Sequence, residues 1–258
     1  MRRMLGSLVW ALLAVSIAVL PFLAGAASAT APRPLASPAG VLLVTFDIQV
    51  DAGAADYVHR AAQAAIASNQ DLVIVMNTPG GLLANMQQIV RSIQDVQDAR
   101  LAVYTYVPPV AFAASAGSYI ALATNGIYMG SGSIIGPSTP FVVGGDPSEE
   151  QHVQNAMVAY IRSLAEKNGY NVTAAVDMAQ NNTAYSAVQA ASVGLVNGTQ
   201  ESLGAFLTAV GLGTATITTF DEPLSDSSVS SAIPPWTASS SSSGSLPSSS
   251  ICSIGPFS

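Results

Sequence analysis

The sequence has little charge, one cysteine and two histidines, and each shortage excludes a class of function. Charged residues make up 9% of the 258 residues, and the formal net charge is −7. A chain with so few cations offers no basic patch to neutralise phosphates, so we expect no nucleic-acid partner. Because Cys252 is the only cysteine, no intramolecular disulfide and no cysteine-based metal site can form.

Metal and cofactor sites also lack a pattern in the sequence. His59 and His152 are too few and too far apart along the chain to indicate a metal centre. The sequence has no glycine-rich phosphate loop that ends in lysine, so it predicts no ATP site. We therefore expect neither a metal nor a cofactor. Half of the residues are apolar, which suits one core rather than two large domains.

Residues 1–29 have the pattern of a targeting segment. Arg2 and Arg3 precede an uncharged, mostly apolar run from Leu5 to Leu23, and the small residues Ala27-Ser28-Ala29 follow as a cleavage signature. The apolar run approaches the roughly 20 residues that span a bilayer, so an uncleaved N-terminal anchor is the alternative. Either reading predicts that the rest of the chain is extracytosolic, secreted or anchored to the membrane. Residues 30–39 hold three prolines and are predicted to be a spacer.

Residues 40–222 alternate between apolar runs and stretches of helical period, which predicts one domain. The expected strands are 41–46, 72–76, 101–107 and 126–129, and the expected helices are 56–68, 83–97, 152–167, 172–179 and 187–196, with another beginning near Ser115. This alternation predicts an α/β fold with a mostly parallel sheet covered by helices. Residues 131–150 are predicted to be a loop, and the serine-rich residues 223–258 a disordered tail or linker.

Two short motifs carry the chemistry. Asn77-Thr78-Pro79-Gly80-Gly81 ends an apolar run, and its paired glycines let the backbone turn sharply enough to point N–H groups into an open site. Further along, Ser115 stands among small residues in Ala113-Ala114-Ser115-Ala116-Gly117. Backbone donors from one loop and a hydroxyl from another are the two parts that acyl transfer needs, an oxyanion hole and a nucleophile.

The stretch from Val41 to about Val196 resembles the ClpP-like serine peptidases, and more closely the protease domain of the NfeD group, the partners of stomatin-type proteins. The resemblance rests on NTPGG, AASAGSYIALAT, GSGSIIGP and the helix HVQNAMVAYIRSLAEKNG. It implies a ClpP/crotonase-like fold with repeated strand-strand-helix units. It also implies Ser115 as the nucleophile and Gly80, Gly81 and Ala116 as the oxyanion hole.

The general base departs from the NfeD pattern. In that group, the resemblance implies a lysine base near the start of the helix that follows the loop. The only lysine here, Lys167, lies at the far end of that helix. The matching position holds His152, whose neutral imidazole can accept the serine proton. Activity should then rise with pH between roughly 6 and 7, the usual imidazole range. Candidates to orient the imidazole are Asp146, Glu149, Glu150 and Asp177, although these acids are also typical of surface charges.

The remaining polar and aromatic residues near the motifs have simpler interpretations. His59 is interpreted as a surface residue, and the other serines as loop or capping residues, namely Ser118, Ser131, Ser133 and Ser138. Phe112, Tyr119 and Phe141 could line a pocket for apolar side chains. The resemblance implies cleavage of hydrophobic segments in a peptide or in a stomatin-like membrane protein near the membrane. It also implies a homo-oligomer, with a dimer as the expected state.

Two other functions compete with a serine endopeptidase. The first is a catalytically inactive scaffold that keeps the fold and binds a membrane protein, with His152 marking the loss of the base. The second is a crotonase-like acyl-CoA enzyme, which would share the oxyanion architecture. Export disfavours the acyl-CoA enzyme because CoA thioesters are cytosolic, and the scarcity of basic residues for the CoA phosphates also disfavours it.

Overall fold

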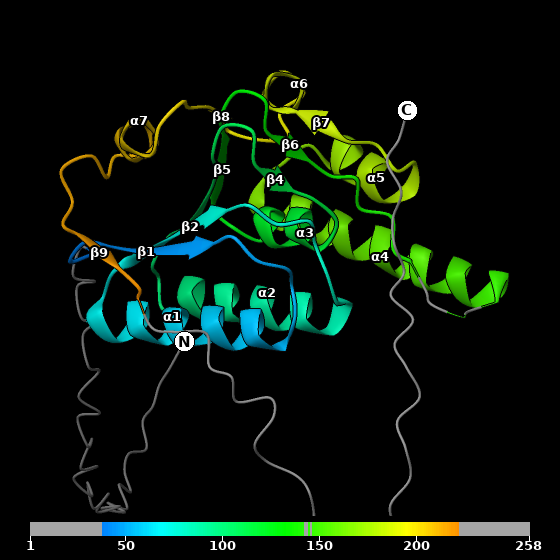
Figure 1. The fold of residues 1–258 in the computed structure, drawn as a ribbon, viewed down its shortest axis with the longest axis horizontal. Coiled ribbons are helices and arrows are strands. Elements are labelled where there is room, and N and C mark those ends of the chain that lie inside the picture. Colours follow the sequence, from blue (N-terminus) through cyan, green and yellow to red (C-terminus); the bar gives the residue numbers. More distant parts are fainter. Residues whose placement is uncertain (1–37, 142–143, 145, 222–258) are drawn as a thin grey trace, which may run out of the picture. The chain divides into compact units, whose positions relative to one another are not determined.

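A parallel sheet forms the centre of the computed structural model, which describes residues 38–141, 144 and 146–221 (Figure 1). Each neighbouring pair of its six strands runs parallel. In spatial order these strands are β8 (Gly198–Thr199), β5 (Gly126–Met129), β3 (Val103–Val107), β2 (Asp71–Met76), β1 (Val41–Phe46) and β9 (Ile217–Thr219). The predicted α/β fold with a mostly parallel sheet is therefore confirmed.

The central strands are apolar because both faces of the sheet are covered. In β2 the residues from Leu72 to Ile74 are fully buried, and β1 pairs with it in register from Val41↔Asp71 to Phe46↔Met76. Unbroken runs of branched apolar residues are typical of such doubly covered strands. This is why the sequence locates β1, β2 and β5 to within one residue.

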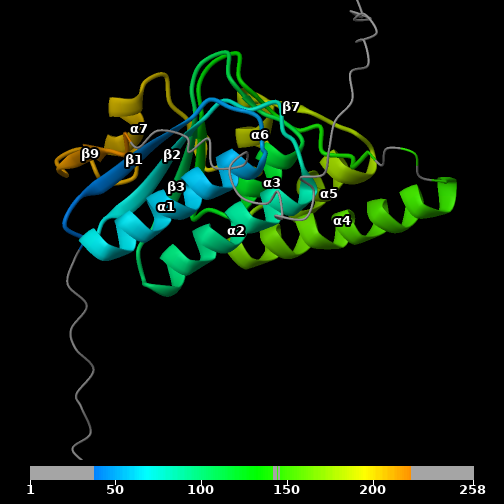
Figure 2. The same ribbon diagram turned by 60° about the horizontal axis from the view of Figure 1, so that its bottom comes forward.

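Two long helices cover one face of the sheet (Figures 1 and 2). These are α1 (Ala52–Ser68) and α2 (Leu83–Asp98), which pack against each other. Helix α1 begins four residues earlier than predicted because the Asp51 side chain caps it, accepting a hydrogen bond from Ala54 N at 2.8 Å. Helix α2 begins two residues after Gly81, with Leu82 as its N-cap, so the turn leads into the helix.

A second group of helices continues this layer. Helix α3 packs between α2 and α4, and α4 packs on α5. Their bounds, with that of α6, are α3 (Ala116–Leu122), α4 (Pro147–Asn168), α5 (Val172–Gln180) and α6 (Ala187–Ser192).

The prediction that residues 131–150 form only a loop is wrong at both ends. The last four of them already belong to α4, because Asp146 accepts hydrogen bonds from the N–H groups of Ser148 and Glu149. The Glu149 side chain in turn accepts from the N–H of Asp146, which completes a capping box. Near the start of the segment, residues 134–135 form strand β6.

A small second sheet, which the sequence analysis did not predict, carries the serine motif. It orders β4 (Phe112–Ala113), β6 (Ile134–Ile135) and β7 (Tyr185–Ser186), with β4 parallel and β7 antiparallel to β6. Each strand has two residues, too few for a period to show in the sequence. This sheet joins the segment before Ser115 to the segment that begins the predicted loop.

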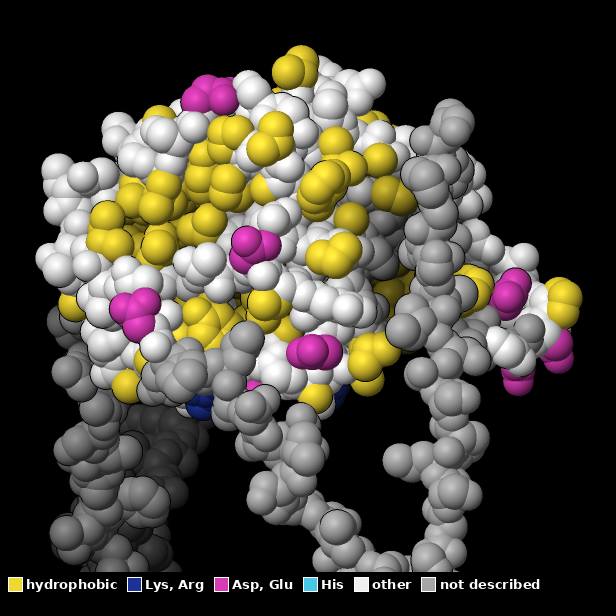
Figure 3. All heavy atoms as spheres, viewed as in Figure 1, with side chains coloured by type: hydrophobic (Ala, Val, Ile, Leu, Met, Phe, Trp, Pro, Cys, Tyr) yellow, Lys and Arg dark blue, Asp and Glu magenta, His cyan; other side chains and the backbone are white. Residues whose placement is uncertain are grey.

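The other face of the main sheet has its own apolar cluster under α7 (Leu203–Ala209). Phe206 is fully buried there and stacks on Tyr106 with ring centroids 5.1 Å apart. Figure 3 shows apolar side chains gathered on the surface that includes this region, with few charged residues among them. Helix α7 and β9 lie in a stretch for which the sequence analysis predicted no element.

The predictions for both chain ends fall outside the described residues. The targeting segment 1–29, nearly all of the spacer and the serine-rich tail belong to ranges that the structure does not describe. Among residues 38–141, 144 and 146–221, no helix is both long and apolar enough to cross a bilayer.

Candidate active site

Ser115 occupies a sharp turn between β4 and α3. Its backbone has φ +50° and ψ −119°, a combination that side chains with a Cβ rarely adopt. Such a conformation costs on the order of 1–3 kcal/mol and persists only where the surroundings enforce it. The half-buried Ser115 does not serve as a side-chain cap of α3, and within the described residues its Oγ has no hydrogen-bond partner. The structure thus holds an unengaged hydroxyl at a strained turn.

Gly80 faces this hydroxyl from the other motif. A Cβ on Gly80 would lie 2.5 Å from Ser115 Cβ and 3.0 Å from Ser115 Oγ, so a side chain there would collide with Ser115. Gly80 also has φ +102°, a conformation that glycine adopts without strain. The fold therefore brings together the two motifs that the sequence analysis paired.

The motif Asn77–Gly81 also forms hydrogen bonds with β4, the strand that leads to Ser115. The Asn77 side chain accepts a hydrogen bond from Phe112 N at 3.0 Å and donates one to Asp47 Oδ1 at 2.8 Å. Thr78 exchanges backbone hydrogen bonds with this strand, donating to Phe112 O and accepting from Ala114 N. From the sequence alone, Asn77 and Thr78 are interpreted only as the residues that end a strand. Their role as anchors of the serine turn depends on the β4 pairing, which the sequence analysis did not predict.

Close packing explains the glycine two residues after the serine. A Cβ on Gly117 would lie 2.6 Å from Thr78 Cγ2, so α3 could not approach the Thr78 segment with any larger residue at that position. Thr78 itself is fully buried.

Two backbone donors near the serine turn are free. Within the described part of the chain, neither the N–H of Gly81 nor the N–H of Ala116 donates a hydrogen bond. Ala116 is the first residue of α3, where a helix leaves its N–H groups without intrahelical partners. The N–H of Gly80, by contrast, donates to Thr78 Oγ1 at 3.2 Å. Gly80 contributes the absence of a side chain, while Gly81 and Ala116 contribute unengaged donors.

The structure does not bring His152 to Ser115. His152 lies in the second turn of α4, its side chain is exposed, and among the described residues it forms no hydrogen bond. Figures 1 and 2 show the start of α4 projecting beyond the body of the domain. A Ser–His hydrogen bond is therefore absent from this arrangement. Lys167, in the last turn of α4, is also exposed.

The four acids considered as orienting groups have other partners or none. Asp146 and Glu149 form the capping box of α4, and Glu150 is exposed beside them. Asp177 accepts hydrogen bonds from Asn181 at 2.6 Å and from Tyr185 at 2.9 Å. The hydrogen bonds from Asn181, Thr183 and Tyr185 lower the pKa of the Asp177 carboxyl. Within the described residues none of these acids contacts the His152 ring by a hydrogen bond.

The aromatic residues near the site divide into exposed and buried ones. Phe112 is 46% exposed and Phe141 is 84% exposed, so both are available to an apolar ligand. Tyr119 does not line a pocket, which corrects that prediction. It is buried, stacks on Tyr160 of α4, and donates a hydrogen bond to Ser138 O, and burial raises the pKa of its phenol.

Of the other serines, Ser131, Ser133 and Ser138 lie in loops, as predicted, whereas Ser118 lies inside α3, where neither a loop nor a cap was expected. Ser131 bonds to the Glu201 carboxylate, and Ser133 donates to Gly130 O. Ser118 and Ser138 are buried and bond to each other under the serine turn.

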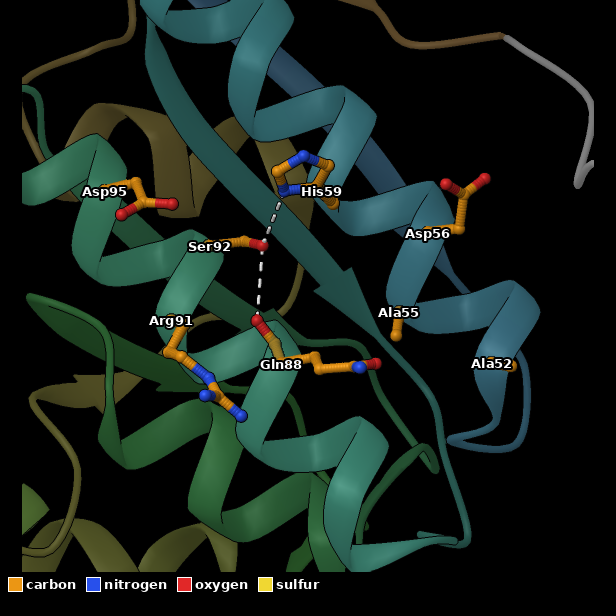
Figure 4. A pocket seen from close by; sticks show the side chains of 8 residues that line it. All are labelled: Ala52, Ala55, Asp56, His59, Gln88, Arg91, Ser92 and Asp95. Carbon is orange, nitrogen blue, oxygen red and sulfur yellow. Dashed lines mark hydrogen bonds between the residues drawn. The ribbon is translucent and has the colours of Figure 1, made fainter.

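His59 lies on the surface, as predicted, in a groove of about 400 Å³ between α1 and α2 (Figure 4). Its Nδ1 is 3.3 Å from Ser92 Oγ. The Ser92 hydroxyl donates to Gln88 O, so the His59 Nδ1–H is the donor to Ser92. Ser115 is not among the residues that line this groove. Among the described residues, no group of three metal-ligating side chains is placed to hold an ion.

Comparison with solved structures identifies the class of fold as that of the ClpP-like proteases. A mutant of the 1510-N membrane-bound stomatin-specific protease superposes with a TM-score of 0.63 at 26% identity, covering 73% of this chain and all of that one. A lysine-to-alanine mutant of the same protease, in complex with a substrate peptide, gives 0.63 at 26% identity over 72% of this chain and 92% of that one. ClpP1 from Listeria monocytogenes gives 0.52 at 20% identity over 62% of this chain and 91% of that one, a likeness of fold alone.

The chain belongs to the NfeD1b N-terminal domain family, whose model matches residues 40–220. The membrane-bound protease PH1510 of Pyrococcus horikoshii is 35% identical over 130 residues, and the membrane protein NfeD1b of Bacillus subtilis is 32% identical over 144 residues. These matches cover 48% and 54% of this chain but only 29% and 31% of the two relatives. The chain therefore corresponds to less than a third of each curated relative.

Proposed function

We propose that this protein is a serine endopeptidase in which Ser115 is the nucleophile. The observation that carries the proposal is the strained turn, which presents a hydroxyl without a partner opposite a glycine that leaves room for it. A strained turn that exposes a nucleophile between a strand and a helix is a recurring device of serine hydrolases. The similarity to a stomatin-specific protease supports the same conclusion.

The proposed reaction proceeds through an acyl-enzyme. Ser115 Oγ attacks the carbonyl carbon of the scissile peptide while a base accepts its proton, and the carbonyl oxygen becomes an oxyanion. The free N–H groups of Gly81 and Ala116 are the proposed donors to that oxyanion. Return of the proton to the leaving amine cleaves the C–N bond, and water then hydrolyses the ester to release the second product.

We propose His152 as the base. Of the two histidines, His59 forms a hydrogen bond with Ser92 in a separate groove. His152 lies in α4, the first helix after Ser138 in the sequence. Catalytic hydrogen bonds are often long or unformed before substrate binds, so the exposed position of His152 does not exclude the role. Productive contact requires a different position of the start of α4 relative to Ser115.

Apolar segments of a peptide or membrane protein are the proposed substrates. Large apolar side chains are exposed just after the paired glycines and on both sides of Ser115 in sequence, namely Leu82, Val110, Phe112 and Phe141. A cleft of about 310 Å³ beside Asn77, lined partly by Pro108, Pro109 and Val110, lies at the carboxyl ends of β1–β3. The relatives named for stomatin support a stomatin-like membrane protein as partner.

An extracytosolic site of action, at or near a membrane, completes the proposal. It is supported by the targeting pattern of residues 1–29 and by relatives that are membrane-bound. We also propose a homo-oligomer, with a dimer as the first state to test by sedimentation.

A catalytically inactive scaffold is the competing function, and one observation favours it. The only lysine of the chain, Lys167, is exposed in the last turn of α4, and the His152 ring is exposed without a hydrogen bond to any described residue. A scaffold would bind the same apolar segments without cleaving them.

Cleavage of an apolar peptide panel by the full chain tests these alternatives. Ser115→Ala should abolish turnover, and His152→Ala should reduce it by at least about 100-fold if the imidazole is the base. His59→Ala is the matched control, because it removes the other exposed imidazole, and it should leave turnover unchanged. Turnover that survives His152→Ala would place the base elsewhere, and a parent chain that binds the peptides without cleaving them would favour the scaffold.

A further inference from the structure

We propose that Ser118 and Ser138 are positioning residues for Ser115, because a relay of two buried hydroxyls fixes one end of the Ser115 backbone while Pro137 fixes the other. The inference rests on the proposed function, in which Ser115 is the nucleophile. It assigns a role in the reaction to two serines that the sequence alone identifies only as loop or capping residues.

The donor and the acceptor in each hydrogen bond of the relay can be assigned, because each serine hydroxyl has only one hydrogen to donate. Ser118 is completely buried and Ser138 is 2% exposed. The Ser118 hydroxyl donates its only hydrogen to the carbonyl oxygen of Ser115 at 2.7 Å. In the Ser118–Ser138 hydrogen bond, Ser138 must therefore be the donor and Ser118 the acceptor. The relay runs from Ser138 through Ser118 to the carbonyl of Ser115.

The other end of the same residue is held by the neighbour of Ser138. The N–H of Ser115 donates to Pro137 O at 2.7 Å. The carbonyl of Ser115 accepts from both the N–H and the hydroxyl of Ser118. Pro137 therefore holds Ser115 at its N–H, and Ser138 acts on its carbonyl through the Ser118 hydroxyl. A strained residue needs such a two-sided hold, because its backbone would otherwise relax to a common conformation.

The segment of Pro137 and Ser138 is itself fixed to two helices. The N–H of Ser138 donates to Met178 O in α5 at 2.9 Å, and the carbonyl of Ser138 accepts from the Tyr119 hydroxyl in α3 at 3.1 Å. Both backbone groups of Ser138 are therefore used, and its side chain is left to act on Ser118. Burial of a hydroxyl costs desolvation, which offsets much of the stability that its hydrogen bond contributes. The value of the two hydroxyls lies in the geometry that they impose on Ser115.

Three single alanine variants of the full chain, and the double variant of Ser118 and Ser138, test the role. Ser118→Ala and Ser138→Ala break the relay, and Ser133→Ala is the matched control, because Ser133 is also fully buried and its hydroxyl also donates to the carbonyl three residues earlier. The readouts are the rate at which a fluorophosphonate labels Ser115, and kcat and KM on a cleaved peptide, measured where circular dichroism shows every variant folded.

A displaced nucleophile lowers the rate more than the affinity. Ser118→Ala and Ser138→Ala should each reduce labelling and kcat by about 10- to 100-fold, with KM changed by less than about twofold. Ser133→Ala should change the labelling rate and kcat by less than about twofold. The double variant should lose no more than the worse single variant, because the two hydroxyls act as one unit. Equal losses in Ser118→Ala and Ser133→Ala, or losses that multiply in the double variant, would overturn the proposal.

Amide hydrogen exchange separates this inference from the proposed function. The Ser115 N–H is protected by its bond to Pro137, so loosening the turn should speed its exchange in Ser118→Ala and Ser138→Ala but not in Ser133→Ala. This readout needs no catalysis. A parent chain that is neither labelled nor active would refute the proposed function, whereas unchanged Ser115 exchange in both relay variants would refute the positioning role.

Discussion

At the scale of single residues, the backbone conformation of Ser115 lowers the stability of the folded state while it places the hydroxyl opposite Gly80. Its Cβ makes the observed φ and ψ unfavourable, and alanine would carry the same Cβ, whereas glycine would not. Residues selected for function commonly lower the stability of the folded state in this way. Such a conformation would be unnecessary if Ser115 only began a helix, because an ordinary N-cap has extended backbone.

The strain at this turn predicts different effects for two substitutions. Ser115→Gly should raise the free energy of unfolding by about 1 kcal/mol. This net value is the strain energy that is relieved, reduced by the greater conformational entropy of glycine in the unfolded chain. Ser115→Ala should change it by less than about 0.5 kcal/mol, because the Cβ remains. Urea denaturation of both variants measures the difference. Equal stabilities for the two would show that the turn is not strained.

Thr105, in β3, carries a buried hydroxyl that has no hydrogen-bond partner among the described residues. It lies in the middle of the sheet, opposite Ile74 and Ile127 on the neighbouring strands. Thr105→Val replaces the hydroxyl by a methyl group of similar size, so it should raise the free energy of unfolding by about 1 kcal/mol. Thr45→Val, at an exposed position of β1, is the control and should have a smaller effect. A loss of stability in Thr105→Val would mean that the hydroxyl has a partner.

Asp71 should make stability depend on pH. Burial raises the pKa of this carboxyl, although a hydrogen bond from Ala102 N opposes the shift. The folded state therefore binds the proton more tightly than the unfolded state, so this contribution to stability is present below the unfolded pKa and is lost as pH rises through the folded pKa.

Asp71→Asn keeps an oxygen that can accept from Ala102 N and removes the charge. The variant should be more stable than the parent at pH 7. The difference in stability should disappear below about pH 3, where the Asp71 carboxyl is protonated in both the folded and the unfolded state. Thermal unfolding from pH 2.5 to 8 measures this. A variant less stable than the parent at pH 7 would contradict the assignment of burial as the dominant cause.

At the scale of elements, the start of α4 is distinct from the rest of that helix. Its buried residues, Met157, Ile161, Leu164 and Ala165, all lie beyond its first ten residues. The first turns are held by the Asp146 capping box, the half-buried Val153 and a hydrogen bond from Gln154 to Gln180 O. A helix end with few buried contacts opens locally without unfolding of the whole domain. The proposed base, His152, is on this weakly held part.

Removal of the cap should therefore loosen the start of α4 without unfolding the domain. Asp146→Ala loses a cap worth about 1 kcal/mol, which should speed amide exchange in residues 147–156 and leave the midpoint of thermal unfolding nearly unchanged. Ser202→Ala removes the cap of α7, whose Phe206 and Leu207 are buried, so it should lower global stability by about 1 kcal/mol instead. A large fall in the unfolding midpoint of Asp146→Ala would show that the first turns of α4 carry the fold.

The long elements could be predicted from the sequence, because their periodicity extends over enough residues. Apolar runs located β1 and β2, and the spacing of Met157, Ile161 and Leu164 located the body of α4. The start of α4 was missed because the Gly- and Pro-rich composition of the loop outweighed Asp146, Pro147 and Glu149, which together are a helix-start signal. Strands of two residues, such as β4 and β6, give no periodic signal at all.

The pairing of Gly80 with Ser115 could also be predicted, since both lie in the motifs on which the resemblance to the ClpP-like peptidases rests. The anchoring of the turn by Asn77, and the relay of Ser118 and Ser138, could not be predicted because each depends on the small second sheet and on tertiary contacts between distant segments. The role of His152 stays a prediction, because position along the chain does not fix where an imidazole points.

At the scale of the whole molecule, the domain has two apolar clusters, one on each face of a parallel sheet. The larger cluster holds α1 to α5 against the sheet, and the smaller one holds α7. The Ser115 turn lies beside the carboxyl ends of β1 to β3, the edge at which α/β folds place their ligands. The rigid sheet thus positions both motifs, while the proposed base is on a helix end that projects from it (Figure 2).

Reaction of the full chain with a fluorophosphonate, followed by mass spectrometry of the modified peptide, shows directly whether Ser115 is the nucleophile. We expect one adduct per chain, located on Ser115 and lost in Ser115→Ala, while Ser118, Ser133 and Ser138 remain unmodified. Absence of an adduct on folded parent protein, or an adduct that persists in Ser115→Ala, would contradict the assignment of Ser115 as the nucleophile.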